Sequence, residues 1–118
     1  MTMTRGDVVI LDHPFSDGSG SKVRPDLIVQ NDRYNGRLTN TIVALITRNV
    51  SRAIEPSQLL IDIATPDGHT SGLNQNFAVV CTNLFTVSQR KIRRAIGSLP
   101  PALMTRVDDC LKVALHLP

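Results

Sequence analysis

Short segments rich in branched apolar residues alternate with polar, glycine- and proline-containing stretches along most of the chain. This alternation predicts several β-strands joined by turns, as in an antiparallel barrel or sandwich. Polar turns are expected at 16–21 and 34–37, and a longer polar loop at 65–76. The five predicted strands cover residues 7–12, 26–31, 41–47, 58–63 and 77–81.

The last third of the chain predicts a different element. Residues 86–91 indicate a turn or a short helix with Ser88 as its N-cap. Residues 92–99 fit either a continued helix or a sixth strand, and their periodicity does not decide between the two. Pro100 and Pro101 can begin a helix. In that helix an apolar residue recurs every four positions, at Leu103, Val107, Leu111 and Leu115. A mainly β domain closed by one amphipathic helix is therefore expected.

With 118 residues, 42% of them hydrophobic, the chain has the size and composition of one globular domain, 1–118. No apolar stretch approaches the ~20 residues that cross a bilayer. The N-terminus lacks the apolar segment of a secretory signal, so a cytoplasmic protein is expected. Cys81 and Cys110 lie among apolar neighbours without a CxxC motif, and we expect buried free thiols. No metal site and no cofactor are expected.

Thirteen basic and ten acidic residues give a net charge of +3, which is compatible with a polyanionic partner without requiring one. Lys22 and Arg24 follow the first turn, and Arg90, Lys91, Arg93 and Arg94 form a second group. Each group could contact phosphates or form a solvated face. For the second group, the solvated face is the slightly favoured interpretation. Aromatic residues are scarce, which argues against a binder that relies mainly on base stacking.

Several segments resemble the MazF/PemK toxins in order and spacing. The N-terminal ones are Arg5-Gly6-Asp7-Val8-Val9, the stretch 18–25 (GSGSKVRP), 27–32 (LIVQND) and 42–47 (IVALIT). The C-terminal ones are 71–73 (SGL), 79–86, 96–99 (IGSL) and the helix that follows. The resemblance implies an SH3-like antiparallel barrel with a C-terminal helix, a strand rather than a helix at 92–99, and a homodimer.

The resemblance also implies a function. Proteins of this family cleave single-stranded RNA at short sequences without a metal, leaving a 2′,3′-cyclic phosphate and a 5′-hydroxyl, and a cognate antitoxin protein silences them. The family's catalytic arginine and threonine match Arg24 and Thr47. A guanidinium can donate to two oxygens of a phosphorane, and a threonine hydroxyl can donate to the same oxygens or orient the arginine. Because a guanidinium stays protonated in proteins, we expect electrostatic stabilisation first and proton transfer second.

Further residues are expected to contact RNA: Gly18, Ser19, Gly20, Lys22, Arg48, Asn83 and His13. His13 has a side chain suited to proton transfer near neutral pH. Relatives often carry an apolar or aromatic residue there, so a peripheral RNA contact is expected instead. Without the resemblance, Arg24 would be expected as a surface arginine paired with Asp17 or Asp26. On the fifth strand, Val80, Cys81 and Thr82 stand where some relatives carry a charge, so no carboxylate from that strand is expected in the mechanism.

Two alternatives to a ribonuclease remain open. Gyrase-poisoning toxins share this fold and act by binding a topoisomerase through their C-terminal helix, but His116-Leu117-Pro118 lacks their aromatic tip. A degraded toxin that binds only RNA or antitoxin is the second alternative. Arg24 and Thr47 favour the nuclease over both, because fold alone does not decide function.

Overall fold

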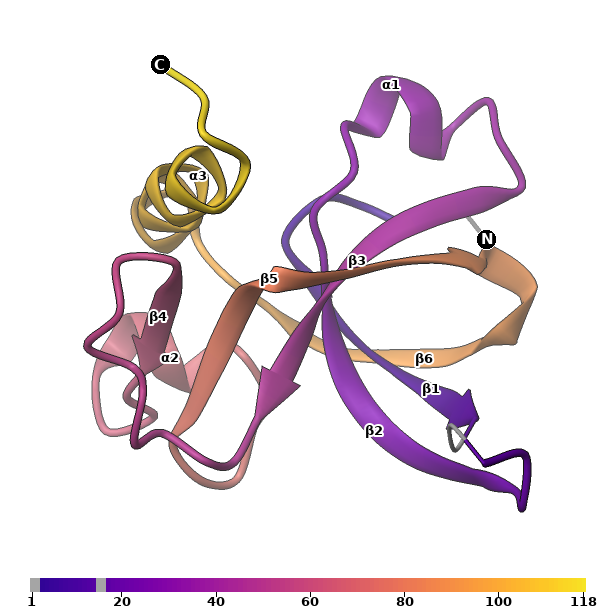
Figure 1. Ribbon diagram of the computed structural model, residues 1–118, viewed down its shortest axis with the longest axis horizontal. Helices are drawn as coiled ribbons and strands as arrows, with labels where there is room; N and C mark the ends of the chain where they lie inside the picture. The colour runs from indigo at the N-terminus through magenta and orange to yellow at the C-terminus, as the bar shows by residue number, and fades with distance from the viewer. Residues whose placement is uncertain (1–2, 15–16) are drawn as a thin grey trace.

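A computed structural model describes residues 3–14 and 17–118, and its strands form one antiparallel sheet. The strands are β1 (Asp7–Pro14), β2 (Ser21–Ile28), β3 (Asn40–Thr47), β4 (Gln58–Ile61), β5 (Phe77–Ser88) and β6 (Ile92–Ser98). They lie in the order β4-β5-β3-β2-β1-β6, and the sheet is strongly curled (Figure 1). Helix α3 (Pro101–Leu115) packs against β4 and β5. The predicted mainly β fold with a C-terminal helix is confirmed.

The strand limits differ from the sequence prediction at two functional places. Strand β2 begins at Ser21 rather than at residue 26, because the β1–β2 hairpin pairs as far as Pro14 with Ser21. Lys22 and Arg24 therefore lie on a strand. Strand β5 continues to Ser88 rather than ending at residue 81. Its register against β3 shifts between Ala44 and Leu45, and this irregularity lets it follow β3 over a second stretch.

The connections and β6 agree more closely with expectation. Residues 92–98 form a strand, as the resemblance implied, and Ser88 caps the short 3-10 helix η1 (Gln89–Lys91). The short helix α1 (Asp32–Asn35) begins two residues before the predicted turn at 34–37 and overlaps it, and the polar loop contains α2 (Pro66–His69). Strand β4 ends at Ile61, two residues earlier than predicted.

Two apolar clusters occupy opposite faces of the sheet. The larger lies under α3 and includes Val8, Leu27 and Val107. The smaller includes Val9 and Ile28. Successive strand residues point to opposite faces, so Val8 and Val9 enter different clusters. Burial of both faces explains why the central strands are apolar nearly throughout.

The apolar face of α3 is only partly the predicted one. Leu103 and Val107 are buried and Leu111 packs against the larger cluster, but Leu115 is 52% exposed. A spacing of four residues turns about 40° further round a helix at each step, so a strict fourfold series drifts off the buried face. Met104 and Cys110 complete that face instead. Cys81 and Cys110 are both free and buried, as predicted.

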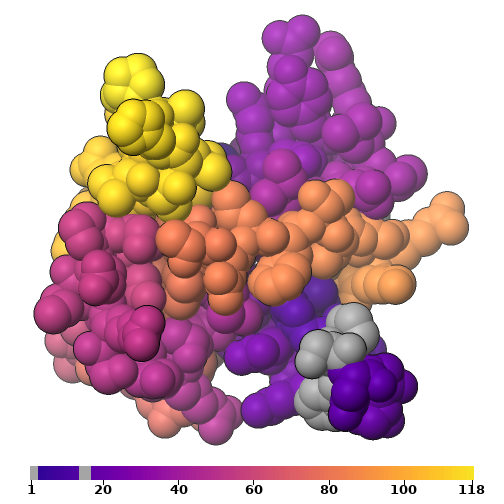
Figure 2. All heavy atoms as spheres, in the orientation of Figure 1, coloured from indigo at the N-terminus to yellow at the C-terminus, as the bar shows by residue number. Residues whose placement is uncertain are grey.

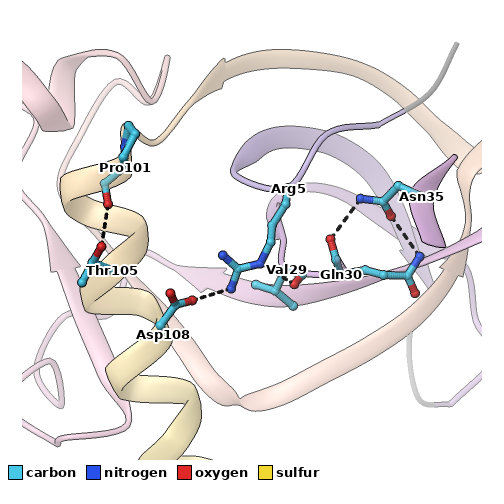
Figure 3. Close-up of polar contacts among 7 residues, drawn as sticks. All are labelled: Arg5, Val29, Gln30, Asn35, Pro101, Thr105 and Asp108. Atoms are coloured by element: carbon cyan, nitrogen blue, oxygen red, sulfur yellow. Dashed lines mark hydrogen bonds and ion pairs between the residues drawn. The ribbon is translucent and has the colours of Figure 1, made fainter. Parts of the chain in front are cut away.

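Arg5 ties the N-terminal segment to α3. Its Nε donates to the carbonyl oxygen of Val29 at 2.8 Å, and its Nη2 contacts Asp108 Oδ1 at 2.6 Å (Figure 3). Nearby, the buried amides of Gln30 and Asn35 satisfy each other: Gln30 Nε2 donates to Asn35 Oδ1 at 2.9 Å, and Asn35 Nδ2 donates to the carbonyl of Gln30 at 3.0 Å. Arg5 and Gln30, which both lie in segments that resemble the toxin family, therefore have structural roles here.

Within the described ranges, no helix combines the length and apolarity needed to span a membrane.

Two glycines with the same backbone angle allow a matched stability test. Gly72 and Gly18 both have φ +75°, but a Cβ on Gly72 would overlap the carbonyl of Ile96, whereas nothing lies within 4 Å of one on Gly18. Gly18→Ala should lower the free energy of unfolding by about 1 kcal/mol through backbone strain alone. Gly72→Ala should lower it by about 3 kcal/mol or more, because β6 must also move. Denaturant unfolding measures both, and equal losses would contradict the packing argument.

Candidate active site

The β2–β3 ladder ends early, at the pair Asp26 with Leu45. Val29 N donates to the carbonyl of Ile42 at 3.0 Å, so alternate residues of β2 direct their N–H groups toward β3. Pro25 is one of those residues, and it has no N–H to donate. The two strands therefore separate beyond Asp26, while β2 stays paired with β1. Figure 2 shows the molecule open between the end of β3 and the start of β2.

A cleft of about 250 Å³ fills this separation. If the register of Asp26 with Leu45 is continued by two residues, Arg24 falls opposite Thr47. Both residues line the cleft, so the structure brings the two predicted catalytic side chains together. The full lining is Lys22, Val23, Arg24, Pro25, Ile46, Thr47, Arg48, Asn49 and Phe77.

The Thr47 hydroxyl is held in place by the backbone that follows it. Its Oγ1 accepts a hydrogen bond from Asn49 N at 3.1 Å. A hydroxyl has one proton to donate besides its acceptor sites. The contact with Asn49 therefore uses an acceptor site and leaves the proton for an anionic oxygen in the cleft.

The charged side chains that line the cleft are all cationic: Lys22, Arg24 and Arg48. A neighbouring depression of about 290 Å³ is also lined by Arg24 and Arg48, and there Arg94 joins them from β6. The cleft and this depression, which share Arg24 and Arg48, are called the basic groove below. Phosphates of a nucleic acid are the natural ligand for such a row of cations.

The basic cluster at residues 90–94 is divided by the structure. Arg94 lies in the basic groove, whereas Arg93 Nη2 binds Asp12 at 3.1 and 3.2 Å. Arg90 and Lys91 line a separate depression with Arg93. Of the two possibilities left open for this group, the place in the basic groove fits Arg94 alone, because alternation along β6 sends Arg93 and Arg94 to different faces. The sequence did not distinguish Arg94 from the other three, and the pairing of β6 with β1 does.

Arg24 makes neither of the ion pairs considered from the sequence. Asp17 accepts from Ser19 N at 2.9 Å, and Asp26 binds His13. The Nε atom of Arg24 is buried and, among the residues that the structure describes, has no hydrogen-bond partner.

His13 is not the peripheral residue that was predicted. Its Nε2 contacts Oδ2 of Asp26, a carboxyl that is fully buried. Its ring lies edge-on to Phe85, with ring centroids 5.4 Å apart. Only 13% of the His13 side chain is exposed. Sequence periodicity could not show this contact, because it runs diagonally between β1 and β2.

The ionisation of this pair follows from its burial. Burial raises the pKa of Asp26 to about 8, although the charge of Arg24 and the backbone amide of Ile46 act in the opposite direction. Burial, followed by the charge of Arg24, lowers the pKa of His13. Both shifts disfavour a charged pair. At neutral pH the carboxyl proton therefore lies between a neutral Asp26 and a neutral His13.

The remaining predicted RNA-contacting residues lie outside the cleft. Gly18, Ser19 and Gly20 form the exposed tip of the β1–β2 hairpin, and the amide of Ser19 is occupied by Asp17. Asn83 is exposed on β5 within the irregular stretch between its two blocks of pairing with β3. Their contacts with RNA stay predictions. Among residues 3–14 and 17–118, no group of three or more His, Cys, Asp or Glu residues is placed to hold a metal ion.

Comparison with known proteins agrees with this fold. Residues 4–115 match the family described as PemK-like, MazF-like toxin of type II toxin–antitoxin system. The chain is 29% identical over 118 residues to endoribonuclease EndoA of Bacillus subtilis, covering 99% of this chain and 97% of that protein. It is 30% identical over 119 residues to endoribonuclease MazF6 of Mycobacterium tuberculosis, covering 99% and 100% of the two chains.

Solved structures give the same result. A mycobacterial endoribonuclease in complex with its cognate antitoxin superposes with a TM-score of 0.76 at 26% identity, covering 98% of this chain and 97% of that one. The Mycobacterium tuberculosis toxin MazF-mt6 gives 0.75 at 26% identity, covering 95% and 98%. The class defined by the sheet, the helix and these matches is the toxin component of type II systems. The chain belongs to the PemK/MazF family of toxin–antitoxin endoribonucleases.

The raised pKa of Asp26 predicts how stability depends on pH. A carboxyl whose folded pKa lies above its unfolded value stabilises the fold fully below pH ~4, and this contribution is lost as pH rises toward about 8. Asp26→Asn cannot ionise at this position, so it does not lose stability in this way. The difference in melting temperature between Asp26→Asn and wild type should therefore shift in favour of the variant between pH 5 and pH 9. Asp12→Asn, which changes a partly exposed carboxylate on β1, is the control. A difference for Asp26→Asn that is constant with pH would contradict the assignment.

Proposed function

We propose that this chain is a metal-independent endoribonuclease toxin that cleaves single-stranded RNA at short sequences. The products would be a 2′,3′-cyclic phosphate and a 5′-hydroxyl. The observation that carries the proposal is the meeting of Arg24 and Thr47 in a cleft whose other charged side chains are cations. The relatives named as endoribonucleases, which match over nearly their whole length, support the same activity.

The chemistry needs only groups that the cleft supplies. The ribose 2′-oxygen attacks the adjacent phosphorus, and the bond from phosphorus to the 5′-oxygen breaks. The 2′-hydroxyl loses a proton and the departing oxygen gains one, so no water is consumed in this step. Negative charge grows on the phosphorane oxygens, where the Arg24 guanidinium and the Thr47 hydroxyl donate hydrogen bonds. Lys22 and Arg48 hold neighbouring phosphates.

Single-stranded RNA is the substrate class that fits the basic groove. A nucleophilic 2′-hydroxyl is absent from DNA, and a flexible single strand can adopt the in-line geometry that a duplex restrains. Contacts from Gly18, Ser19, Gly20, Asn83 and His13 remain part of the proposal. The base sequence would be selected by side chains along the groove and the hairpin tip.

Partners are proposed on the basis of the relatives. One structural relative is an endoribonuclease bound to its cognate antitoxin, and another is a MazE–MazF complex from Deinococcus radiodurans. We propose that this chain likewise forms a homodimer in the cytoplasm and is silenced by a cognate antitoxin protein. A gyrase-binding toxin of the same fold is less well supported, because the matched relatives are named as endoribonucleases.

Replacing Arg24 tests the catalytic assignment. Arg24→Ala should lower the rate of cleavage of a mixed-sequence RNA, measured with chelator present, by about 100- to 1,000-fold, because the charge that meets the phosphorane is lost. Arg24→Lys should recover only part of the rate, since an ammonium cannot donate in a bidentate manner. Circular dichroism and sedimentation check that both variants stay folded. Wild-type rates in Arg24→Ala, or no chelator-resistant cleavage by wild type, would refute the proposal.

The role of Thr47 is tested through its hydroxyl. Thr47→Val, which keeps the shape of the side chain, should lower kcat by about 10- to 100-fold with a smaller change in KM, because the donated bond matters most in the transition state. Thr47→Ser retains the hydroxyl and should stay close to wild type. Single-turnover cleavage of a short RNA separates the two variants. Equal activity of Val and Ser variants would remove Thr47 from the mechanism.

A further inference from the structure

Two buried atoms on one face of β2 lack a well-formed hydrogen bond among the described residues: Nε of Arg24 and Oδ1 of Asp26. The backbone N–H of Ile46 acts on the Asp26 carboxyl but does not outweigh its burial. The two residues are two positions apart on the strand, so their side chains emerge on the same face. An unpaired polar atom in the interior is costly, and an unpaired ionised carboxylate far more so. The carboxyl must therefore keep a proton or acquire a cation.

His13 determines which of these holds at rest. It occupies the other carboxyl oxygen, Oδ2, and is itself held by Phe85. A carboxyl that keeps its proton and donates a hydrogen bond to His13 is neutral and needs no cation. Arg24, which lines the cleft, then has no counter-ion among the residues that the structure describes.

The other charged groups around Asp26 and His13 either bind another residue or line a different part of the surface. On β1, Asp12 binds Arg93. On β2, Lys22 is exposed and lines the cleft. From β3, the residue paired with Asp26 is Leu45, and from β5 the contact on His13 is Phe85. Lys91 of η1 lines the depression beside His13 rather than the basic groove. Arg24 is the cation whose charge acts on both Asp26 and His13.

We propose that Asp26 is a positioning residue for Arg24. While the Asp26 carboxyl keeps its proton against His13, the Arg24 guanidinium is free to bind an RNA phosphate. Once Asp26 loses that proton, the carboxylate attracts the guanidinium as its counter-ion and withdraws it from the phosphate. The inference rests on the proposed ribonuclease function. It is physically reasonable because an ionised carboxylate at this site competes with phosphate for the same charge-assisted hydrogen bonds. His13 acts here as the group that retains the proton on the pair.

The proposal fixes the direction of the pH dependence. Because the pKa of Asp26 is about 8, the carboxyl is mostly protonated at pH 7 and mostly ionised at pH 9. Asp26→Asn keeps the neutral form at every pH. The ratio of kcat/KM for the variant to that for wild type should therefore rise about tenfold between pH 7 and pH 9. A residue that is merely structural would change the rate without changing this profile.

The test compares wild type, Asp26→Asn and Asp12→Asn on one short RNA, in chelator, from pH 6 to pH 9.5. Binding of the same RNA with a 2′-deoxy sugar at the cleavage site is measured in parallel. Wild-type binding should weaken at alkaline pH, and Asp26→Asn should abolish that weakening. Asp12→Asn should show the wild-type profile. A ratio that does not change with pH would overturn the proposal.

A measurement on wild type alone covers the case in which Asp26→Asn does not fold. The ¹⁵N chemical shift of Arg24 Nε, followed by NMR in the absence of RNA, should change with a midpoint near pH 8 as the Asp26 contact forms. A chemical shift that stays constant across this pH range would overturn the proposal. Failure of the ribonuclease function is distinguishable, because it appears as absent cleavage at every pH, while the NMR titration still reports on Asp26 and Arg24.

Discussion

The missing N–H of Pro25 is the constraint on which the candidate site depends. It ends the β2–β3 ladder after the pair Asp26 with Leu45. Strands β2 and β3 then separate, while β2 stays next to β1 and β3 stays next to β5. The resulting cleft has walls of regular β-structure rather than loops, which holds Arg24 and Thr47 on rigid supports. Catalytic groups need such support, because small displacements weaken electrostatic stabilisation strongly.

The site is locally unfavourable and is stabilised from elsewhere. Cations gather in the basic groove without ion-pair partners among residues 3–14 and 17–118, and the fully buried carboxyl of Asp26 lies next to Arg24 on the same face of β2. The two apolar clusters and the Arg5 contacts with β2's end and α3 supply the offsetting stability. Among the described residues, two of the three buried side-chain atoms without a hydrogen-bond partner, Arg24 Nε and Asp26 Oδ1, lie at the site. Such a concentration is expected where function conflicts with folding.

The sequence predicted the elements with apolar runs and missed what depends on pairing. Strand 41–47 and the helix after Pro101 agree because periodicity reports burial directly. The start of β2 was missed because an exposed polar strand resembles a loop. The second half of β5 was missed because Thr82 and Asn83 interrupt its apolar run, although Leu84 and Val87 pack against the two clusters. In the site, Arg24 and Thr47 came from family resemblance. Arg94 and the contact of His13 with Asp26 depend on register between strands, which no single-strand pattern contains.

The position of β1 between β2 and β6 also constrains the order in which the chain can fold during synthesis. Its hairpin with β2 is local, whereas its other edge pairs Asp7 with Ser98, near the far end of the chain. A ribosome makes the N-terminal strands first, and pairings between distant segments form late. A nascent chain that ends before residue 92 has Arg24 and Thr47 but lacks Arg94, β6 and the cover of α3. The groove is therefore complete only after residues 92–98 have been made and have paired with β1.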